Sequence, residues 1–370
     1  MPLPNFNLPS GSTCSVKVIE NGSILGNVAT KAAVAPPIPG FDVLPSFPSY
    51  SFLIEGPNGR KILFDLGIRP DWRKLAPIVV NRISIQGWDL GADKHIATIL
   101  EENSQDLNEI EAIILRCAHE AKAKITLLLS HWHWDHMGDP STFPASTSLV
   151  VGPGFKKAFL PGYPEWEDSP ILKRDYEGRK IIEIDFAEQP SLKIGRLDAY
   201  DYFEDGSFYI LNAPGHAIGH ICALARTTSA PDTFVLIAAD AIHHCGELRP
   251  SEYLPIPESI FPHPFNSHTD PYCPGHILDY LQTSRGRKSD EPFLVPLLGC
   301  DVAEVVCTVE KVKEADCHEN IFVIFSHDDN VKNIIDFFPA DINQWRQKNW
   351  GQVAKWKFLK DFAKALDVSS

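Results

Sequence analysis

The residues with the clearest chemistry are the six that run from position 131 to position 136, His-Trp-His-Trp-Asp-His. Imidazole nitrogens and carboxylate oxygens are ligands well suited to Zn²⁺, and iron or manganese can take the same set. On a strand-to-loop junction, residues two apart point the same way. His131 and His133 can therefore share one metal while Asp135 and His136 turn toward a second. With 14 histidines in 370 residues, such a cluster arises by chance in about 10⁻³ of chains of this composition.

Three more side chains able to bind metal follow apolar, β-prone runs. His216 follows FYILNAPG, Asp240 follows TFVLIAA and His327 follows NIFVIFS, just as His131 follows ITLLLS. Central strands present the side chains at their carboxyl ends along one edge of a sheet, so these residues are predicted to meet there. Most of the remaining histidines of this half lack such a strand context and are predicted to lie outside the site: His220, His243, His244, His263, His268 and His276.

Two hairpins and two helices are expected around these residues. Residues 49–66 read as a hairpin turning at Asn58-Gly59, and residues 192–215 as a strand pair turning at Asp205-Gly206. Helical spacing covers 93–107 and 301–317, the second beginning at Asp301 as N-cap. The face expected to be apolar in that second helix consists of Val302, Val305, Val306, Val309 and Val312.

The C-terminal residues 341–366 form a third helical region, and its aromatic stripe of Trp345, Trp356 and Phe362 is predicted to pack against the body of the protein. Long loops are expected at 26–48 and 246–276, either contacting substrate or wrapping the surface. In the first case they would form an apolar cleft over the metals, lined by Pro36, Ile38, Phe41, Leu44, Phe47, Tyr253, Ile260, Phe261 and Phe265.

Composition excludes some classes of function. The net charge is −14 and no run is rich in lysine or arginine, which argues against a nucleic-acid partner because that affinity comes from cationic side chains. No stretch of about 18 apolar residues is present, and the N-terminus lacks the features of a signal peptide. We therefore expect a cytoplasmic protein with no membrane partner. The oligomeric state is left open.

At the residues described above, the chain resembles the metallo-β-lactamase superfamily, whose pattern is HxHxDH, then a histidine in a PGH-type turn, an aspartate and a last histidine. The segments SHWHWDHMGDP and NAPGHAIGH are most similar to the N-acyl-homoserine-lactone lactonases and to related lactone- or lactam-opening enzymes. The resemblance implies an α+β fold, a four-layer αββα sandwich, with residues 1–370 forming one domain. The motif is specific for the fold and far less so for the substrate.

The resemblance also implies a ligand set and a mechanism. It assigns His131, His133 and His216 to one Zn²⁺, assigns Asp135, His136 and His327 to the other, and makes Asp240 the bridging carboxylate. A hydroxide between the ions would attack the carbonyl of a small, uncharged, partly hydrophobic lactone or lactam. Asp135 could pass the proton. His243 stands where these lactonases carry tyrosine, and it either donates a hydrogen bond to the substrate carbonyl or only supports a turn, as could His244.

Besides His243, the chain differs from the family pattern just before residues 131–136. There, EAIIL at 111–115 and ITLLLS at 125–130 both read as the strand that leads into this motif. Residues 116–126 could therefore be an insertion. The alternative functions are a thioesterase of the polyketide or glutathione type, and a metal-binding protein without hydrolytic activity. A zinc β-lactamase of the main subclass is disfavoured because it would have cysteine in place of Asp240.

Overall fold

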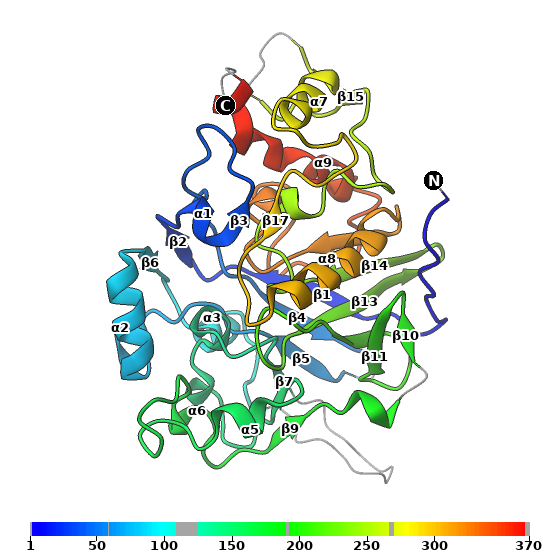
Figure 1. Cartoon of the computed structure of the whole chain (residues 1–370). Coiled ribbons are helices and arrows are strands. Elements are labelled where there is room, and N and C mark those ends of the chain that lie inside the picture. Colours follow the sequence, from blue (N-terminus) through cyan, green and yellow to red (C-terminus); the bar gives the residue numbers. More distant parts are fainter. Residues whose placement is uncertain (1, 58, 109–124, 190–191, 266–269, 367–370) are drawn as a thin grey trace.

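The computed structural model describes residues 2–57, 59–108, 125–189, 192–265 and 270–366. In this part of the chain, two mixed sheets of six strands each form the centre of the molecule (Figure 1). The first has the order β1 (Ser15–Ile19), β4 (Ser51–Glu55), β5 (Lys61–Phe64), β7 (Ile125–Leu128), β8 (Leu149–Val151) and β9 (Ile181–Glu183). The second has the order β10 (Lys193–Ile194), β11 (Leu197–Asp201), β12 (Phe208–Asn212), β13 (Ile221–Ser229), β14 (Asp232–Ile237) and β18 (Ile321–Ile324).

Helices cover the outer faces of these sheets. The α-helices are α1 (Thr30–Ala33), α2 (Pro77–Gln86), α3 (Ile96–Glu102), α4 (Trp134–Met137), α5 (Phe155–Phe159), α6 (Lys173–Tyr176), α7 (His276–Thr283), α8 (Val302–Asp316) and α9 (Trp350–Lys355). The 3-10 helices are η1 (Trp72–Lys74), η2 (Pro140–Thr142), η3 (Phe186–Glu188), η4 (Cys245–Glu247), η5 (Asp329–Val331) and η6 (Lys357–Leu366). Short antiparallel pairs join β2 (Ile24–Gly26) to β6 (Asp89–Gly91), β3 (Val34–Ala35) to β17 (Val295–Pro296), and β15 (Ser259–Ile260) to β16 (Cys273–Pro274).

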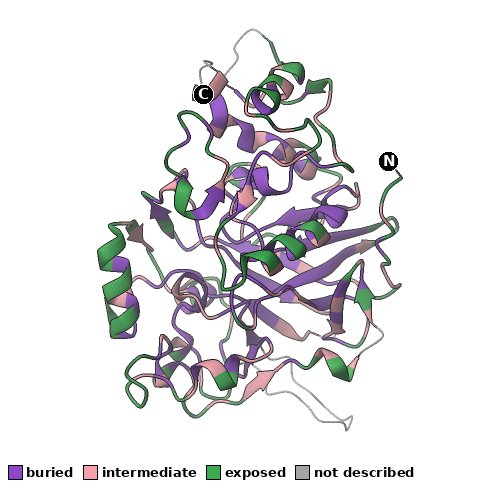
Figure 2. Cartoon of the chain, viewed as in Figure 1, coloured by how far each residue is buried: buried purple, intermediate pink, exposed green. Residues whose placement is uncertain are grey.

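Each sheet is buried on both of its faces, so the fold has four layers: two sheets in the middle and helices outside them. In β4, Phe52 and Ile54 point into the core between the sheets, whereas Leu53 points into the outer core shared with α3 and α5. On the other side, Val305 of α8 and Phe362 of η6 pack on the outer face of the second sheet. Figure 2 shows the central strands of both sheets buried along nearly their whole length, whereas the edge strands β9, β10 and β11 are partly exposed. The chain thus has the expected α+β, αββα sandwich, and buried apolar contacts between its layers hold it together.

Both predicted strand pairs are present. β4 and β5 pair antiparallel within 49–66, while Asn58 of the expected turn lies outside the described residues. β11 and β12 pair antiparallel, and Gly206 adopts a φ of +76° between them. Of the two runs expected to lead into the metal-binding motif, the second forms β7, while the run at 111–115 and most of 116–126 lie outside the described residues.

The helix predictions need three corrections. The helix expected at 93–107 is shorter, α3 covering Ile96–Glu102. In α8 the Asp301 side chain caps the helix as predicted, but Val302 and Val306 are 37% and 38% exposed. The buried face of α8 instead includes Val305 and Thr308, because residues three or four positions apart lie on the same side of a helix.

The third correction concerns the C-terminal region. Residues 341–349 form turns, and the helical part consists only of α9 and η6. Trp345, Trp356 and Phe362 are nonetheless buried, as predicted for packing against the body. Across the described ranges, no helix is both long and apolar enough to cross a membrane.

Candidate metal centre

The seven predicted ligands meet at one edge of the two sheets because each follows a strand. His131 comes three residues after β7, and α4 then carries Asp135 and His136, with His133 at its N-cap position. His216, Asp240 and His327 follow β12, β14 and β18. The side-chain donors form two groups, His131, His133, His216 and Asp240 in the first and Asp135, His136 and His327 in the second, with the ligand atoms of each group within 4.8 Å of one another.

Asp240 lies between the two groups, and its carboxylate oxygens face different ones. Oδ2 lies 3.4 Å from His216 Nε2 and 3.7 Å from His131 Nε2. Oδ1 lies 3.1 Å from His136 Nε2 and 3.2 Å from His327 Nε2. One carboxylate therefore contacts both sets of imidazoles, which is the placement needed of a bridging ligand.

Hydrogen bonds on the far side of the imidazole rings fix which nitrogen faces the centre. Asp65 Oδ2 accepts from His136 Nδ1 at 2.8 Å and from the Ser130 hydroxyl at 2.7 Å. Ser130 Oγ in turn lies 3.0 Å from His131 Nδ1, and the Pro48 carbonyl accepts from His327 Nδ1 at 2.8 Å. With Nδ1 donating outward, the Nε2 lone pairs of His131, His136 and His327 point into the site.

Burial and charge set the protonation of these groups. Burial lowers the pKa of His131 and His216 well below 6.5, and that of His133 to about 4, so these rings are neutral, the form that binds a metal. Burial would also lower the pKa of His136, but Asp240 and Asp65 raise it well above its usual value. Burial would raise the pKa of Asp240, but His136 and His327 hold it well below 3.8.

Several buried atoms at the centre lack a hydrogen-bond partner among the described residues, including His131 Nε2, His136 Nε2 and Asp240 Oδ1. Leaving buried polar atoms unpaired costs free energy unless another group satisfies them. Imidazole nitrogens and a carboxylate oxygen pointing at common positions are the donors that zinc and similar ions prefer. The residues present therefore fit metal ions at both groups.

His220 is part of the site although its sequence context did not suggest it. Its Nδ1 donates to the Ala213 carbonyl at 2.6 Å, and its Nε2 accepts the backbone N–H of Asp240 at 3.2 Å. The ring is 1% exposed and lies 5.2 Å from the ring of His131, centroid to centroid. The signal in the sequence is the second histidine of NAPGHAIGH, four residues after His216.

His243 and His244 point to different places. His243 Nε2 lies 3.5 Å from Asp240 Oδ2, and its backbone N–H donates to Glu247 Oε1 at 3.1 Å. His244 Nε2 lies 3.2 Å from Asp361 Oδ2, and its Nδ1 accepts the Gly246 N–H. Only the first of this pair faces the cluster. His243 thus lies on the side of the cluster, where the substrate-contacting alternative requires it. The bystander prediction is wrong for His220, whose ring contacts the Asp240 backbone, whereas His263 bonds its own loop at Phe265 and His268 lies outside the described residues.

A further group of metal-compatible side chains, Asp71, His95 and Asp139, has a different explanation. The buried Arg69 guanidinium donates to Asp71 at 2.7 Å and to Asp139 at 2.5 Å. Lys74 also pairs with Asp71 at 3.0 Å and Arg174 lies 3.7 Å from Asp139, so cations already balance both carboxylates and the group is an ion-pair network. It ties the loop after β5 to the end of α4 and so helps to position the metal-binding segment.

The two long loops differ from the predicted apolar cleft. They contain short elements, and Ile38, Phe41, Leu44, Ile260 and Phe265 are buried in the outer core. Among these, Phe41 also borders a cavity beside η6 that none of the seven ligands lines. Such side chains pack inward because the loops cover the sheet and would otherwise leave its face exposed. Phe47, however, lies with its ring 4.9 Å from that of His327, centroid to centroid.

Several known proteins are similar to this chain in sequence. The chain is 40% identical over 371 residues to the protein named gamma-lactamase FDB1 of Fusarium pseudograminearum, covering 98% of this chain and 86% of that one. It is 38% identical over 373 residues to metallo-hydrolase mfmC of Annulohypoxylon moriforme, covering 99% and 92%. It also matches cytochrome P450 monooxygenase mpaDE of Penicillium roqueforti at 41% identity, with 98% of this chain but only 39% of that protein covered. No family model matches the chain.

Among solved structures, an N-acyl homoserine lactone hydrolase with the product N-hexanoyl-L-homoserine bound at its metal centre superposes with a TM-score of 0.55. The match has 17% identity and covers 90% of this chain and all of that one, so it supports the shared fold. The high identity to FDB1 and mfmC over nearly their whole length carries the family assignment. The chain belongs to the metallo-β-lactamase-fold hydrolases, is similar there to proteins named gamma-lactamase, metallo-hydrolase and lactonase, and is a metal-dependent hydrolase.

Proposed function

We propose that this protein is a binuclear zinc hydrolase that opens a small cyclic ester or amide. The observation that carries the proposal is the position of Asp240, whose two oxygens face two separate sets of imidazoles. The names of its relatives, which include a gamma-lactamase, favour a lactam or lactone over a thioester.

In this proposal, His131, His133 and His216 hold one ion and Asp135, His136 and His327 hold the other, with Asp240 between them. When bound, two zinc ions supply Lewis-acid polarisation of a carbonyl and lower the pKa of water to roughly 7. The chain supplies the rest. Asp65, Ser130 and the Pro48 carbonyl hold the imidazole rings in the tautomer that presents Nε2.

Asp135 and His243 are the proposed catalytic side chains. Asp135 Oδ2 lies 3.6 Å from His327 Nε2, so this carboxylate is at the centre and can hold the proton that moves to the leaving oxygen or nitrogen. His243 Nδ1 is buried and has no hydrogen-bond partner among the described residues. When Nδ1 carries a proton, it can donate to the oxyanion that forms when the carbonyl is attacked.

The side chains beside the ligands suit a partly apolar substrate. Trp134, next to His133, stacks on Trp88 with ring centroids 6.4 Å apart, and both are partly exposed. Phe47 covers His327, and Ile218, two residues after His216, is 45% exposed. We infer that this apolar rim contacts the body of an uncharged carbonyl substrate.

A parallel hydrolysis screen tests the function. Zinc-loaded protein would be assayed against γ- and δ-lactones, γ-lactams, thioesters and phosphotriesters, with zinc-loaded His131→Ala as the inactive control. We expect the highest kcat/KM on a lactone or lactam. Turnover of thioesters or phosphotriesters alone would contradict the proposal.

A further inference from the structure

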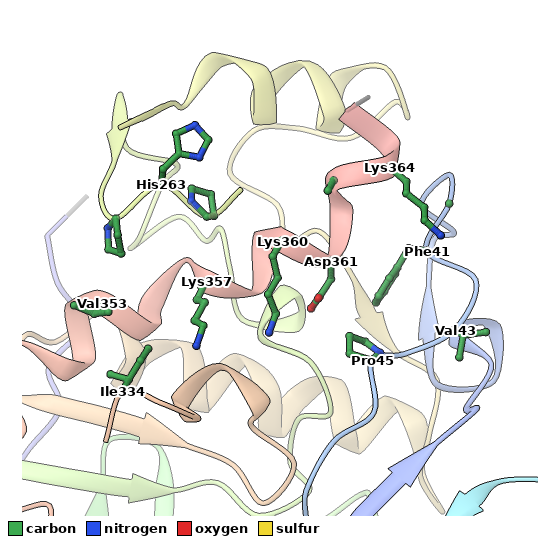
Figure 3. Close-up of a pocket in the computed structure, with 14 residues that line it drawn as sticks. Phe41, Val43, Pro45, His263, Ile334, Val353, Lys357, Lys360, Asp361 and Lys364 are labelled. Atoms are coloured by element: carbon green, nitrogen blue, oxygen red, sulfur yellow. The ribbon is translucent and has the colours of Figure 1, made fainter. Parts of the chain in front are cut away.

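One cavity in the described part of the chain is lined by none of the seven proposed metal ligands. It has a volume of about 640 Å³ and lies between the loop at 40–45, the turn at 262–264 and the C-terminal helices α9 and η6 (Figure 3). That volume is within the range of small-molecule sites, roughly 300–1,000 Å³. The cavity is therefore large enough to hold a ligand the size of a substituted aromatic ring.

Its walls are mainly apolar. Phe41 and Pro45 line one side, and Ile334 and Val353 line the other. In Figure 3 the side chains of Lys357 and Lys360 lie between these two sides and point the same way. The cavity thus combines apolar walls with a cationic strip along η6.

The lysines of this strip are incompletely neutralised. Lys360 Nζ pairs with Asp329 at 2.7 Å, but Lys357 Nζ donates at 2.9 Å to the main-chain carbonyl of Lys332, which carries no charge. Lys364 also lines the cavity. The one carboxylate in the lining, Asp361, already accepts from His244 Nε2 at 3.2 Å. The lining therefore has an excess of positive charge in a protein whose net charge is −14.

Figure 3 shows the two side chains pointing the same way, and burial together with repulsion from the Lys360 ammonium lowers the pKa of Lys357. An anion placed between them would relieve this repulsion. A monocarboxylate with an aryl or branched alkyl body would satisfy both features, its carboxylate on the lysines and its body on Phe41 or Val353.

We propose that this cavity is a binding site for an amphipathic organic carboxylate, held by Lys357 and Lys360 through its charge and by the apolar walls through its body. The proposal rests on the cavity alone and is independent of the hydrolytic function. Because ammonium–carboxylate hydrogen bonds are charge-assisted, the uncharged amide of the same ligand binds about tenfold more weakly.

Isothermal titration calorimetry of the metal-loaded protein with 4-phenylbutyrate and with 4-phenylbutanamide tests this. The acid should bind about tenfold tighter than the amide. Lys357→Gln should remove most of that difference, and Lys357→Arg should restore it. Val353→Trp fills the cavity and should abolish binding of both compounds. The matched control is Lys157→Gln on α5, an exposed lysine outside the cavity, which should change nothing.

Two results would overturn the proposal. Equal affinity for acid and amide in the wild-type protein would show that the lysines do not select an anion. Acid binding that is unchanged in both Lys357→Gln and Val353→Trp would place the carboxylate elsewhere, at the metal ligands. Metal content and melting temperature, measured for every variant, identify any protein that failed to fold, and Lys357→Gln, altered only at a partly exposed side chain, is the deciding variant.

Discussion

His220 accepts a hydrogen bond of 3.2 Å at Nε2 from the backbone N–H of Asp240. Because its Nδ1 donates to the Ala213 carbonyl at 2.6 Å, the imidazole is held in the tautomer that can accept. Ala213 directly follows β12 and Asp240 comes three residues after β14. The ring thus links the two loops that carry His216 and Asp240, and we infer that it positions the carboxylate proposed to bridge the two metal sites.

Replacing His220 with alanine should weaken zinc binding by about 10–100-fold, since supporting partners of metal ligands have effects of that size. Competition with a chromophoric chelator measures the affinity without relying on turnover. His276→Ala, at an exposed position at the start of α7, is the control. If the two variants bind zinc equally well, His220 does not position Asp240.

The neighbours His243 and His244 should behave differently when each is changed to alanine. His243 faces Asp240 while His244 pairs with Asp361, so the first change should lower kcat by about 10²–10³ and the second should have little effect. Zinc content should stay at the wild-type value in both. Unchanged kcat in His243→Ala on a verified substrate would remove this residue from the mechanism.

Removing the metal should destabilise the fold. Ions that bind only the folded state stabilise it by mass action, and the buried cluster around Asp240 has unpaired polar atoms without them. A strong chelator should therefore lower the melting temperature in differential scanning calorimetry, and added zinc should restore it. An identical melting temperature with and without chelator would mean that the cluster binds no metal.

Stability should also depend on pH through Asp175 in α6. Burial and the neighbouring Asp139 raise the pKa of Asp175 to about 7, from 3.8. Between about pH 4 and 7 the folded protein keeps a proton that the unfolded chain releases, so this group lowers stability as pH rises through that window. Asp175→Asn should thus raise the free energy of unfolding by about 2 kcal/mol at pH 8, and by much less at pH 4.

Urea denaturation at the two pH values measures this difference. The exposed Asp168→Asn serves as a matched control, because it makes the same chemical change at an accessible site. A gain for Asp175→Asn that is the same at both pH values would contradict the assignment.

The sequence predicted the cluster because its ligands depend on strand ends. Apolar runs before His131, His216, Asp240 and His327 indicate strands, and the carboxyl ends of neighbouring central strands meet at one edge. The role of His220 could not be predicted this way. His220 accepts a hydrogen bond from the backbone N–H of Asp240, twenty positions later, and the spacing of neighbouring residues cannot indicate such a long-range contact.

The loops show the same limit. The side chains of Phe41 and Ile260 pack in the outer core. Only the arrangement of the layers shows that these loops cover the outer face of a sheet, which would otherwise be exposed to water. Likewise Val302 and Val306 match a helical period, but the position of β18 beside α8 decides which valines are buried. The sequence indicates the helical periodicity, but the element packed against the helix determines which of its faces is buried.

In the proposed mechanism, two zinc ions that share Asp240 enable the protein to open a lactone or lactam ring. The most direct measurement is a zinc titration of metal-free protein, following ring opening of the best substrate from the screen together with bound zinc. We expect activity to saturate at about two equivalents of zinc per chain, and an Asp240→Asn variant to recover neither full zinc occupancy nor turnover. Full activity at one equivalent, or two bound ions with no ring opening of any lactone or lactam, would contradict it.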